Sequence, residues 1–302
     1  MTRAEIENLV LGIYRATETG DASILDDVVH DDVVEHPLNP GQLRGREPLK
    51  QLFGGFSRVI PDLTLTVEDV VSKQDMVAVR SVVRGTPAMT FLGVPPKGQA
   101  ITFGALDMWR VADGRVAEGW HVEDFARVLI DSGVVRLPLR RMSEAPNQAP
   151  YAISDDAASA EAMEGVIRRW YTALHRGDLT EASELLAPSF VNHDSVAPGL
   201  SPTEGKEGTL QAIGVAQSAF PDLDITVADV FGGSGKVAAR IIVRGTHLGA
   251  LPGIPPTGKR FAVMGQEIWR VAGERIVEHW GRFEELDLLQ QLGVLPLPAL
   301  AT

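Results

Sequence analysis

Acidic and histidine side chains recur in two short segments, one near the end of each half of the chain. The segment "GRVAEGWHVED" (114–124) contains His121, and "ERIVEHWGRFEE" (274–285) contains His279, each next to a tryptophan. A carboxyl group that faces an apolar cavity has its pKa raised towards neutrality, because burial disfavours the charged form, and it can then transfer protons. The sequence therefore predicts acid–base chemistry at these positions, provided that the surrounding elements form a cavity.

The candidate proton-transfer groups are acids and histidines on or next to predicted strands, and they occur in both halves. In the first half they are Glu35, His36, Asp62, Asp107, His121 and Asp124. In the second half they are His193, Asp222, Glu267, His279 and Glu284. Structural roles are the alternative: Asp62 and Asp222 follow a proline and could serve a turn, His36 and His193 could be hydrogen-bonded structural histidines, and Asp107 and Glu267 could be solvated.

A further set of residues is predicted to contact a substrate in such a cavity. They are Tyr14, Trp109, Trp120, Tyr171, His247, Trp269 and Trp280. The four tryptophans would serve equally well as core residues, since large aromatic side chains dominate protein interiors.

The chain repeats itself. "WRVADGRVAEGW" from Trp109 matches "WRVAGERIVEHW" from Trp269, and "IPDLTLTVEDVV" from Ile60 matches "FPDLDITVADVF" from Phe220, all at an offset of 160 residues. Near the start of each repeat the offset is 157, which aligns Tyr14 with Tyr171. Self-similarity at a fixed offset indicates duplicated structural units. We expect two domains, 1–135 and 161–302, joined by a linker at 136–160 that is rich in proline, alanine, serine and charge.

Each repeat begins with helical patterning and ends with strands. In the first repeat, the helices are expected at 4–21, 22–29 and 46–60, and β-type runs follow at 63–71, 76–86, 101–111 and 115–124. Helices first and an antiparallel sheet afterwards is an α+β order. We predict a curved antiparallel sheet wrapped by three helices, which would enclose an apolar cavity suited to a small molecule.

Composition excludes several classes of function. The chain has 302 residues, 44% of them hydrophobic and 23% charged, which is typical of two soluble globular domains. The net charge of -12, with no basic tail, argues against a nucleic-acid partner. The chain has no cysteine, no signal-peptide pattern and no apolar run long enough for a membrane, so a cytoplasmic location is expected. No HExxH or similar histidine pair occurs, so no metal is expected.

Several motifs together resemble the SnoaL-like polyketide cyclases of the NTF2-like superfamily, and the resemblance covers nearly all of both repeats. The motifs are "FVNHD", "FPDLDITVADV", "VAARIIVRGTHLG", "GIPPTGKR" and "IWRVAGERIVEHW". The resemblance implies two tandem NTF2-like cones and an acid–base cyclase or isomerase that acts on an apolar, oxygenated, polyketide-like molecule without a cofactor. Carried over by position, it assigns the catalytic carboxylates to Asp124 and Glu284, with His121 and His279 beside them. It also implies that the two cones pack as an internal pseudo-dimer.

The tandem arrangement also resembles the two-domain epoxide hydrolases that close polyether rings. In those enzymes an acid pair opens an epoxide, which implies a Glu35–Asp62 pair in the first repeat. In the second repeat the position of Glu35 is Asn192, so the pair is broken unless Asp194 substitutes. A third possibility is a protein that binds a small molecule without catalysis, since a fold alone does not establish a function.

Overall fold

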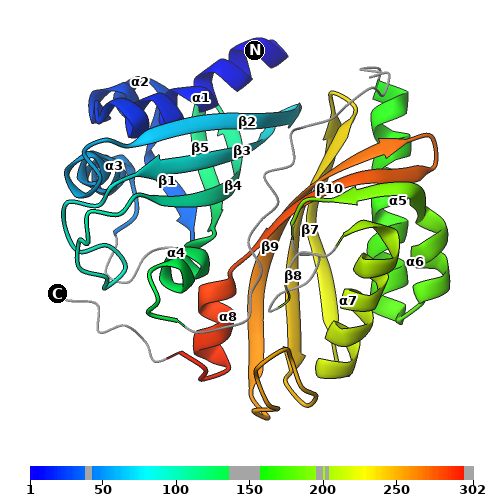
Figure 1. Cartoon of the computed structure of the whole chain (residues 1–302). Helices are drawn as coiled ribbons and strands as arrows, with labels where there is room; N and C mark the ends of the chain where they lie inside the picture. Colours follow the sequence, from blue (N-terminus) through cyan, green and yellow to red (C-terminus); the bar gives the residue numbers. More distant parts are fainter. Residues whose placement is uncertain (38–42, 136–156, 195–199, 201–203, 296–302) are drawn as a thin grey trace. The chain divides into compact units, whose positions relative to one another are not determined.

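The structure is a computed structural model, and it describes residues 1–37, 43–135, 157–194, 200 and 204–295. The chain divides into two compact units, called unit 1 and unit 2 below, whose described parts lie within 1–135 and 157–295 (Figure 1). Residues 136–156 of the predicted linker lie outside the described residues. The last four linker positions, 157–160, are helical instead, because the first helix of unit 2 begins at Ala157.

Unit 1 contains four α-helices, one 3-10 helix and five strands among its described residues. In chain order they are α1 (Arg3–Thr19), η1 (Ala22–Ile24), α2 (Leu25–Val28), β1 (Val29–His36), α3 (Arg46–Val59), β2 (Thr64–Lys73), β3 (Met76–Gly85), β4 (Ile101–Ala112), β5 (Arg115–Glu123) and α4 (Phe125–Asp131). A capping box fixes the start of α1, in which Thr2 accepts from the backbone N–H of Glu5 and Glu5 accepts from that of Thr2. Gly20 ends α1 with a φ of 71°, a conformation that glycine adopts easily.

Unit 2 repeats this order. Its elements are α5 (Ala157–Arg176), α6 (Leu179–Leu185), β6 (Leu186–Asn192), α7 (Gly205–Ala219), β7 (Asp224–Gly233), β8 (Lys236–Thr246), β9 (Arg260–Ala272), β10 (Arg275–Phe283) and α8 (Glu285–Gln291). The strand orders of the two sheets, β1-β5-β4-β3-β2 and β6-β10-β9-β8-β7, are equivalent.

The sheets confirm the α+β prediction and add one feature to it. Four strands of each sheet are antiparallel, as expected, but β1 and β6 pair in parallel with the last strand, so each sheet is mixed. The sequence indicated only a short apolar segment there. The parallel pairing sets Glu35 beside Gly119 and Asn192 beside His279, and it therefore brings the edge strand to the residues singled out above.

Helices cover one face of each sheet, which we call the inner face. In unit 1, Ile13 and Tyr14 of α1 belong to the same buried cluster as Val77, Val79 and Trp109 of the sheet. In unit 2, Trp170 of α5 packs on Trp269, with ring centroids 5.5 Å apart. Side chains alternate along a strand, so every second residue of β4, β5, β9 and β10 points to this inner face, except where a bulge near the start of β5 and of β10 breaks the alternation.

No helix among the described residues is long and apolar enough to cross a membrane. The expected packing of the units as a pseudo-dimer stays a prediction.

Candidate active site

Tyr14, Asp107 and Trp109 form a buried hydrogen-bonded chain on the inner face of unit 1. The Tyr14 hydroxyl donates to Oδ2 of Asp107 at 2.7 Å, and the Trp109 indole N–H donates to the Tyr14 oxygen at 3.0 Å. Burial and the adjacent Asp107 charge raise the pKa of Tyr14 well above its usual value, so its hydroxyl remains a neutral donor. Asp107 is therefore buried and oriented, and the alternative that it is solvated is wrong.

His121 lies between two carboxylates. Its Nε2 is 3.0 Å from Oε1 of Glu35 on β1, and its Nδ1 is 3.4 Å from Oδ1 of Asp107 on β4. Burial by itself lowers the pKa of His121, but the hydrogen bonds and charges of Asp107 and Glu35 outweigh burial and raise the pKa well above 6.5. The imidazole is therefore a cation at neutral pH, held by two acceptors.

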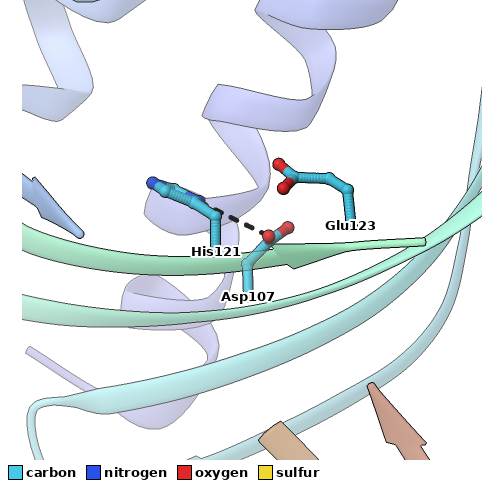
Figure 2. A group of neighbouring side chains, drawn as sticks. All are labelled: Asp107, His121 and Glu123. Carbon is cyan, nitrogen blue, oxygen red and sulfur yellow. Dashed lines mark hydrogen bonds and ion pairs between the residues drawn. The ribbon is translucent and has the colours of Figure 1, made fainter. Parts of the chain in front are cut away.

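Glu123 completes this group and was missed by the sequence analysis. It follows His121 by two residues, so both side chains point to the same face, and it is opposite Ala105 in the pairing of β4 and β5. Acceptor or donor atoms of Asp107, His121 and Glu123 all lie within 4.8 Å of one another (Figure 2). Burial, reinforced by the charges of Asp107 and Glu35 and opposed by that of His121, raises the pKa of Glu123 to about 7. Its carboxyl group is thus close to half ionised at neutral pH.

Asp107, His121 and Glu123 could each offer one ligand atom to a cation. Carboxylate and imidazole ligands would suit a divalent transition metal. A metal would, however, have to displace the proton that the two flanking carboxylates stabilise on His121, since a histidine binds metals in its neutral form. The arrangement suits proton transfer more directly, and the expectation of a site without metal or cofactor stays a prediction.

Unit 2 has an equivalent buried chain of hydrogen bonds, but different residues surround it. Tyr171 donates to Oε2 of Glu267, and the Trp269 N–H donates to Tyr171 at 3.1 Å. His279 lies 3.2 Å from Oε1 of Glu267 through Nε2 and 2.8 Å from Oδ1 of Asn192 through Nδ1. Glu267 is buried, so the alternative that it is solvated is also wrong.

Three positions that carry titratable groups in unit 1 have lost them in unit 2. By the sequence offsets, Asn192 replaces Glu35, Gly281 replaces His121 and Phe283 replaces Glu123. The second histidine, His279, occupies the position of Gly119, two residues earlier on the same face. The equivalent positions of unit 2 therefore contain one acid, Glu267, whereas unit 1 has three, Glu35, Asp107 and Glu123.

Tryptophan geometry explains why the histidine positions differ. A Cβ atom added at Gly119 would lie within 2.6 Å of Cε3 of Trp109, so unit 1 has no room for a side chain there. In unit 2 the His279 ring occupies this place, 4.0 Å from the ring of Trp269 and tilted by 35° to it. The His121 ring is instead edge-on to Trp109, with centroids 4.7 Å apart.

Asp62 and Asp222 lie apart from these groups. Both are exposed at a helix-to-strand junction, where Asp62 accepts from the backbone N–H of Thr86 at 2.6 Å and Asp222 from that of Thr246 at 2.7 Å. The backbone hydrogen bond lowers the pKa of the Asp62 carboxyl group. The pKa of Asp222 is lowered by a hydrogen bond from the Thr246 hydroxyl at 2.6 Å together with the one from the Thr246 backbone. No described contact joins Glu35 to Asp62, so the acid pair that the sequence suggested stays a prediction without structural support.

Asp124 and Glu284 stand at the first turn of the helix that follows each last strand. Asp124 caps α4, with Oδ1 accepting from the backbone N–H of Arg127 at 3.3 Å. Glu284 precedes α8 and accepts from the backbone N–H of Met264 at 2.7 Å, while burial raises its pKa to about 6. Their predicted catalytic role is untested, and Asp124 has a clear structural role.

His36, His193, Trp120 and Trp280 lie on the outer face of the sheets, because they alternate with the inner-face residues. His36 stacks on Trp120 and its Nε2 is 3.0 Å from Glu118. His193 stacks on Trp280, with centroids 4.6 Å apart, and contacts Glu278. The sheet separates all four from the acids of the inner face, such as Asp107 and Glu267. Their catalytic and substrate-contacting roles stay predictions.

Asp194 and His247 take other positions in unit 2. Asp194 forms an ion pair with Arg282. His247 is buried just beyond β8, with Nδ1 3.2 Å from the Thr257 hydroxyl, and burial lowers its pKa. Neither residue is among those that line the cavity of unit 2.

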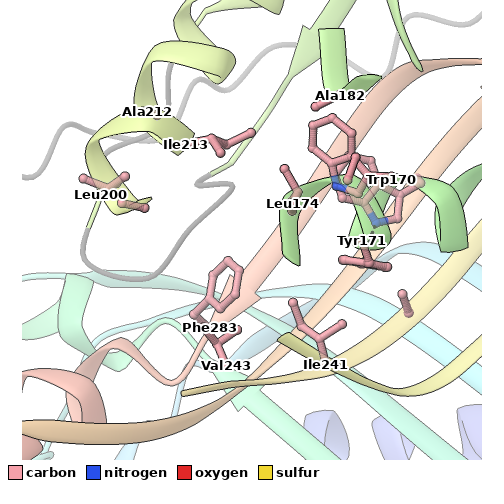
Figure 3. Packing of buried hydrophobic residues seen from close by; sticks show 14 of the residues in the cluster. Trp170, Tyr171, Leu174, Ala182, Leu200, Ala212, Ile213, Ile241, Val243 and Phe283 are labelled. Carbon is pink, nitrogen blue, oxygen red and sulfur yellow. Dashed lines mark hydrogen bonds between the residues drawn. The ribbon is translucent and has the colours of Figure 1, made fainter. Parts of the chain in front are cut away.

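That cavity lies between the inner face of the sheet and helices α5 and α7 (Figure 3). Its lining is Trp170, Tyr171, Leu174, Ile213, Ala216, Gln217, Leu223, Ile225, Ile241, Val243, Glu267 and Phe283. Tyr171 was predicted to contact a substrate and does reach the cavity. The sequence analysis missed Phe283, although its spacing of four residues from His279 places it on the same strand face.

Two α+β units, each with a buried acid and a histidine between helices and a sheet, have the NTF2-like fold. The chain belongs to the SnoaL-like polyketide cyclase family, whose model matches residues 8–131 and 165–292. The match covers both units and confirms the resemblance seen in the sequence.

Several solved structures match the chain over about the length of one unit. TsrD from Streptomyces laurentii is 26% identical, covering 45% of this chain and 99% of its own, with a TM-score of 0.42. IdmH from Streptomyces antibioticus, described as a candidate polyketide cyclase, is 34% identical, covering 42% of this chain and 98% of its own, with a TM-score of 0.39. AclR from Streptomyces galilaeus, described as a candidate hydroxylase, is 27% identical, covering 45% and 100%, with a TM-score of 0.40. No curated protein matches the chain.

Proposed function

We propose that unit 1 is an acid–base cyclase that acts on an apolar, oxygenated, polyketide-like molecule without a cofactor. One observation carries the proposal. A protonated His121 and a Glu123 whose pKa is about 7 lie within reach of a single substrate atom on the inner face. General acid–base catalysis is most effective when the pKa of the group is close to the working pH. Membership of the SnoaL-like family supports the class of reaction.

The proposed reaction is an intramolecular aldol closure. Glu123, in its ionised form, takes a proton from a carbon next to a carbonyl group. The enolate carbon then forms a bond to a second carbonyl carbon, and the resulting alkoxide takes the proton back from Glu123. His121 donates through Nδ1 to the oxygen that carries negative charge, because its 3.4 Å contact with Asp107 is the weaker of its two. No proton or electron is left over.

The remaining residues hold this pair in place. Glu35 accepts from Nε2 of His121 and keeps the ring protonated and oriented. Tyr14, itself held by Trp109, fixes the Asp107 carboxylate. Since these groups are buried and hydrogen-bonded, they require little rearrangement during the reaction.

The apolar part of the substrate would meet a cluster of phenylalanines. Phe103 lies on the inner face of β4, four residues from Asp107, and its ring is 5.3 Å from Phe125 and 6.1 Å from Phe91. Phe56 of α3 adds an edge contact to Phe91. Aromatic walls of this kind bind planar or conjugated apolar molecules and exclude water.

Epoxide opening is a second candidate. One observation favours it, since the site holds a carboxyl group that is partly protonated at neutral pH, Glu123, close to a second carboxyl group, that of Asp107. Glu123 would protonate the epoxide oxygen and Asp107 would accept the proton of the attacking hydroxyl. This pair would replace the Glu35–Asp62 pair inferred from the sequence.

A substrate panel tests both candidates. Purified protein is incubated with linear poly-β-ketone esters and, separately, with hydroxy-epoxides, and products are identified by liquid chromatography and mass spectrometry. We expect cyclised product from the first set and its loss in Glu123→Gln, which keeps the size of the side chain but cannot accept a proton. Asp124→Asn is the matched control one residue away. Full turnover by Glu123→Gln would contradict the proposal, and product from the hydroxy-epoxides alone would favour the second candidate.

A further inference from the structure

We propose that Asp107, His121 and Glu123 of unit 1 form a binding site for a divalent transition-metal ion such as Zn²⁺. The ion would coordinate one oxygen of each carboxylate and Nδ1 of the imidazole. This assignment goes beyond the proposed function, in which the same groups transfer protons and no metal takes part.

The spacing of the three side chains fits a metal site. One ligand atom each of Asp107, His121 and Glu123 lie within 4.8 Å of one another. Zinc–ligand bonds of about 2.0–2.2 Å at a tetrahedral angle set two ligand atoms about 3.3 Å apart. Nδ1 of His121 and Oδ1 of Asp107 are already 3.4 Å apart, so these two atoms need almost no movement. This separation is long for a hydrogen bond, but it suits two ligands of a common ion.

Glu123 can supply the third ligand. None of the other described residues donates a hydrogen bond to its carboxyl group or forms an ion pair with it. Its side chain extends towards Asp107 and His121 (Figure 2). The side chain is flexible and can therefore close the remaining distance. A cation at this place would give the partly buried carboxylate a direct partner of opposite charge.

Hydrogen bonds from outside the ligand set orient the other two ligands. Nε2 of His121 is 3.0 Å from Oε1 of Glu35, which leaves Nδ1 on the side of Asp107. The Tyr14 hydroxyl donates to Oδ2 of Asp107 at 2.7 Å and leaves Oδ1 for the ion. Histidines that bind metals commonly donate their other N–H to a carboxylate, and ligating carboxylates are themselves hydrogen-bonded. Glu35 and Tyr14 are therefore positioning residues of the site.

The ion would replace one proton of His121 and leave the other. The Nδ1 proton passes to solvent, since histidine binds a metal through an unprotonated nitrogen, while the Nε2 proton stays in the hydrogen bond to Glu35. Glu35, Asp107 and Glu123 together provide three carboxyl groups for one imidazole, so a dication brings the net charge of the ionised group closer to zero. One nitrogen and two oxygen ligands favour a first-row transition ion over Mg²⁺ or Ca²⁺, which prefer oxygen ligands.

Unit 2 lacks an equivalent site and provides an internal control. The position of Glu123 is Phe283, whose ring offers no ligand atom. The described contacts of His279 are one carboxylate, that of Glu267, and the amide oxygen of Asn192. One imidazole and one carboxylate are fewer than the three protein ligands of a typical zinc site. We therefore expect one ion per chain.

Titration of the untagged full chain with Zn²⁺ and with Co²⁺, after treatment with EDTA and dialysis, tests the site. Isothermal titration calorimetry gives the number of ions and their affinity, and the visible absorption of bound Co²⁺ reports its ligand set. Glu123→Gln and Asp107→Asn should each weaken binding by at least about tenfold and change the Co²⁺ spectrum, because each removes a charged ligand. Circular dichroism confirms the fold of each variant, and Glu123→Gln decides the test if Asp107→Asn does not fold.

Glu35→Gln tests the positioning of His121. The amide keeps the size of the side chain but loses its charge, so the affinity for Zn²⁺ should fall by about 10- to 100-fold. The spectrum of bound Co²⁺ should stay that of the wild type, since all three ligands remain. His36→Gln and His279→Gln are the matched controls, because each removes a histidine that contacts a glutamate elsewhere, and both should bind one ion as tightly as the wild type.

The proposal is overturned if the wild type binds neither ion, if folded Glu123→Gln binds both ions unchanged, or if His36→Gln abolishes binding. All of these measurements are made without a substrate, so they are separate from the turnover test of Glu123. If unit 1 cyclises a substrate, bound Zn²⁺ should stop turnover and EDTA should restore it, and this consequence rests on the proposed function. A chain that binds Zn²⁺ at this site but turns over no substrate would contradict the proposed function and support the metal site.

Discussion

The inner faces of units 1 and 2 share a fixed part and differ in a variable part. The fixed part is the chain of indole, tyrosine and acid, Trp109–Tyr14–Asp107 in one unit and Trp269–Tyr171–Glu267 in the other. The variable part is what surrounds the acid. Unit 1 adds Glu35, His121 and Glu123, whereas unit 2 offers Asn192, His279 and Phe283.

The comparison separates the residues that orient a buried acid from the residues that we propose to transfer protons. Both units keep the groups that orient one buried acid, which indicates a requirement of the fold as much as of chemistry. The titratable groups on which our mechanism depends occur in unit 1 alone among the described equivalents. A chain with two similar folds can thus contain two sites with different tasks.

The largest effect is expected for the unit 1 acid–base pair. Glu123→Gln or His121→Gln should lower the turnover number by about 10²- to 10⁴-fold, the usual contribution of a general acid or base. His279→Gln in unit 2 should change turnover by less than about tenfold. Steady-state kinetics with the substrate found in the panel checks this. Equal losses of turnover in the unit 1 and unit 2 variants would contradict the proposed functional difference between the units.

The next largest effect is expected on the free energy of unfolding and its dependence on pH. The pKa of Glu123 is about 7 in the folded chain and near 4.5 when unfolded, so the unfolded state releases this proton first as pH rises. Ionisation of the buried Glu123 destabilises the folded chain. This loss of stability is absent below about pH 4.5, grows up to about pH 7 and is complete above it. Glu123→Gln should therefore match the wild type near pH 4.5 and be more stable at pH 8, by up to about 3 kcal/mol.

Urea unfolding of both proteins at the two pH values measures this difference. Phe283→Glu is the reciprocal variant, since it places an acid in the apolar lining of unit 2, and it should destabilise the chain more at pH 8 than at pH 5. A stability of Glu123→Gln that falls below the wild type at pH 8 would show that the ionised carboxylate is well stabilised, contrary to its burial.

A smaller effect is expected at Asp124, the neighbour of Glu123. Asp124→Ala removes the cap of α4, which should lower the free energy of unfolding by about 1 kcal/mol. Turnover should change by less than about tenfold, because the side chain accepts from the backbone of Arg127. Kinetics and urea unfolding of the same preparation separate the two effects. A loss of turnover as large as that of Glu123→Gln would return the catalytic role to Asp124.

The smallest effects are expected at the junction aspartates. Asp62→Asn and Asp222→Asn keep a side-chain oxygen for the backbone N–H groups of Thr86 and Thr246, and both sites are exposed. Turnover should therefore stay within about twofold of the wild type, as for most surface substitutions. Inactivity of Asp62→Asn alone would restore the Glu35–Asp62 pair.

The sequence was sufficient for the fold because the repeat aligned every strand. Two copies at a constant offset reveal which positions share a structural role, and the order of helices and strands then selects the α+β class. The edge strands β1 and β6 were seen only as short apolar segments. Their parallel pairing depends on contacts between residues about 80 positions apart, which local patterning does not report.

The site could be predicted in part. His121 and Glu35 were both candidates, and the structure brings them together at 3.0 Å. Glu123 was missed in favour of Asp124, because the resemblance places the catalytic carboxylate only near the last strand, and a shift of one residue along a strand reverses the face. Glu123 is two residues after His121, so the alternation of side chains along the strand would have placed it on the same face. The shift in the pKa of Glu123 could not be foreseen, since it arises from burial among residues of other strands.

The position of Gly119 has a consequence for how the two halves diverged. A side chain added there first would overlap the Trp109 indole, whereas loss of His121 first would leave Glu35, Asp107 and Glu123 without a cation among them. Neither order of single substitutions passes through an intermediate with a satisfied interior. The exchange of one histidine position for the other is therefore epistatic, and it requires the indole tilt and the acids to change with it.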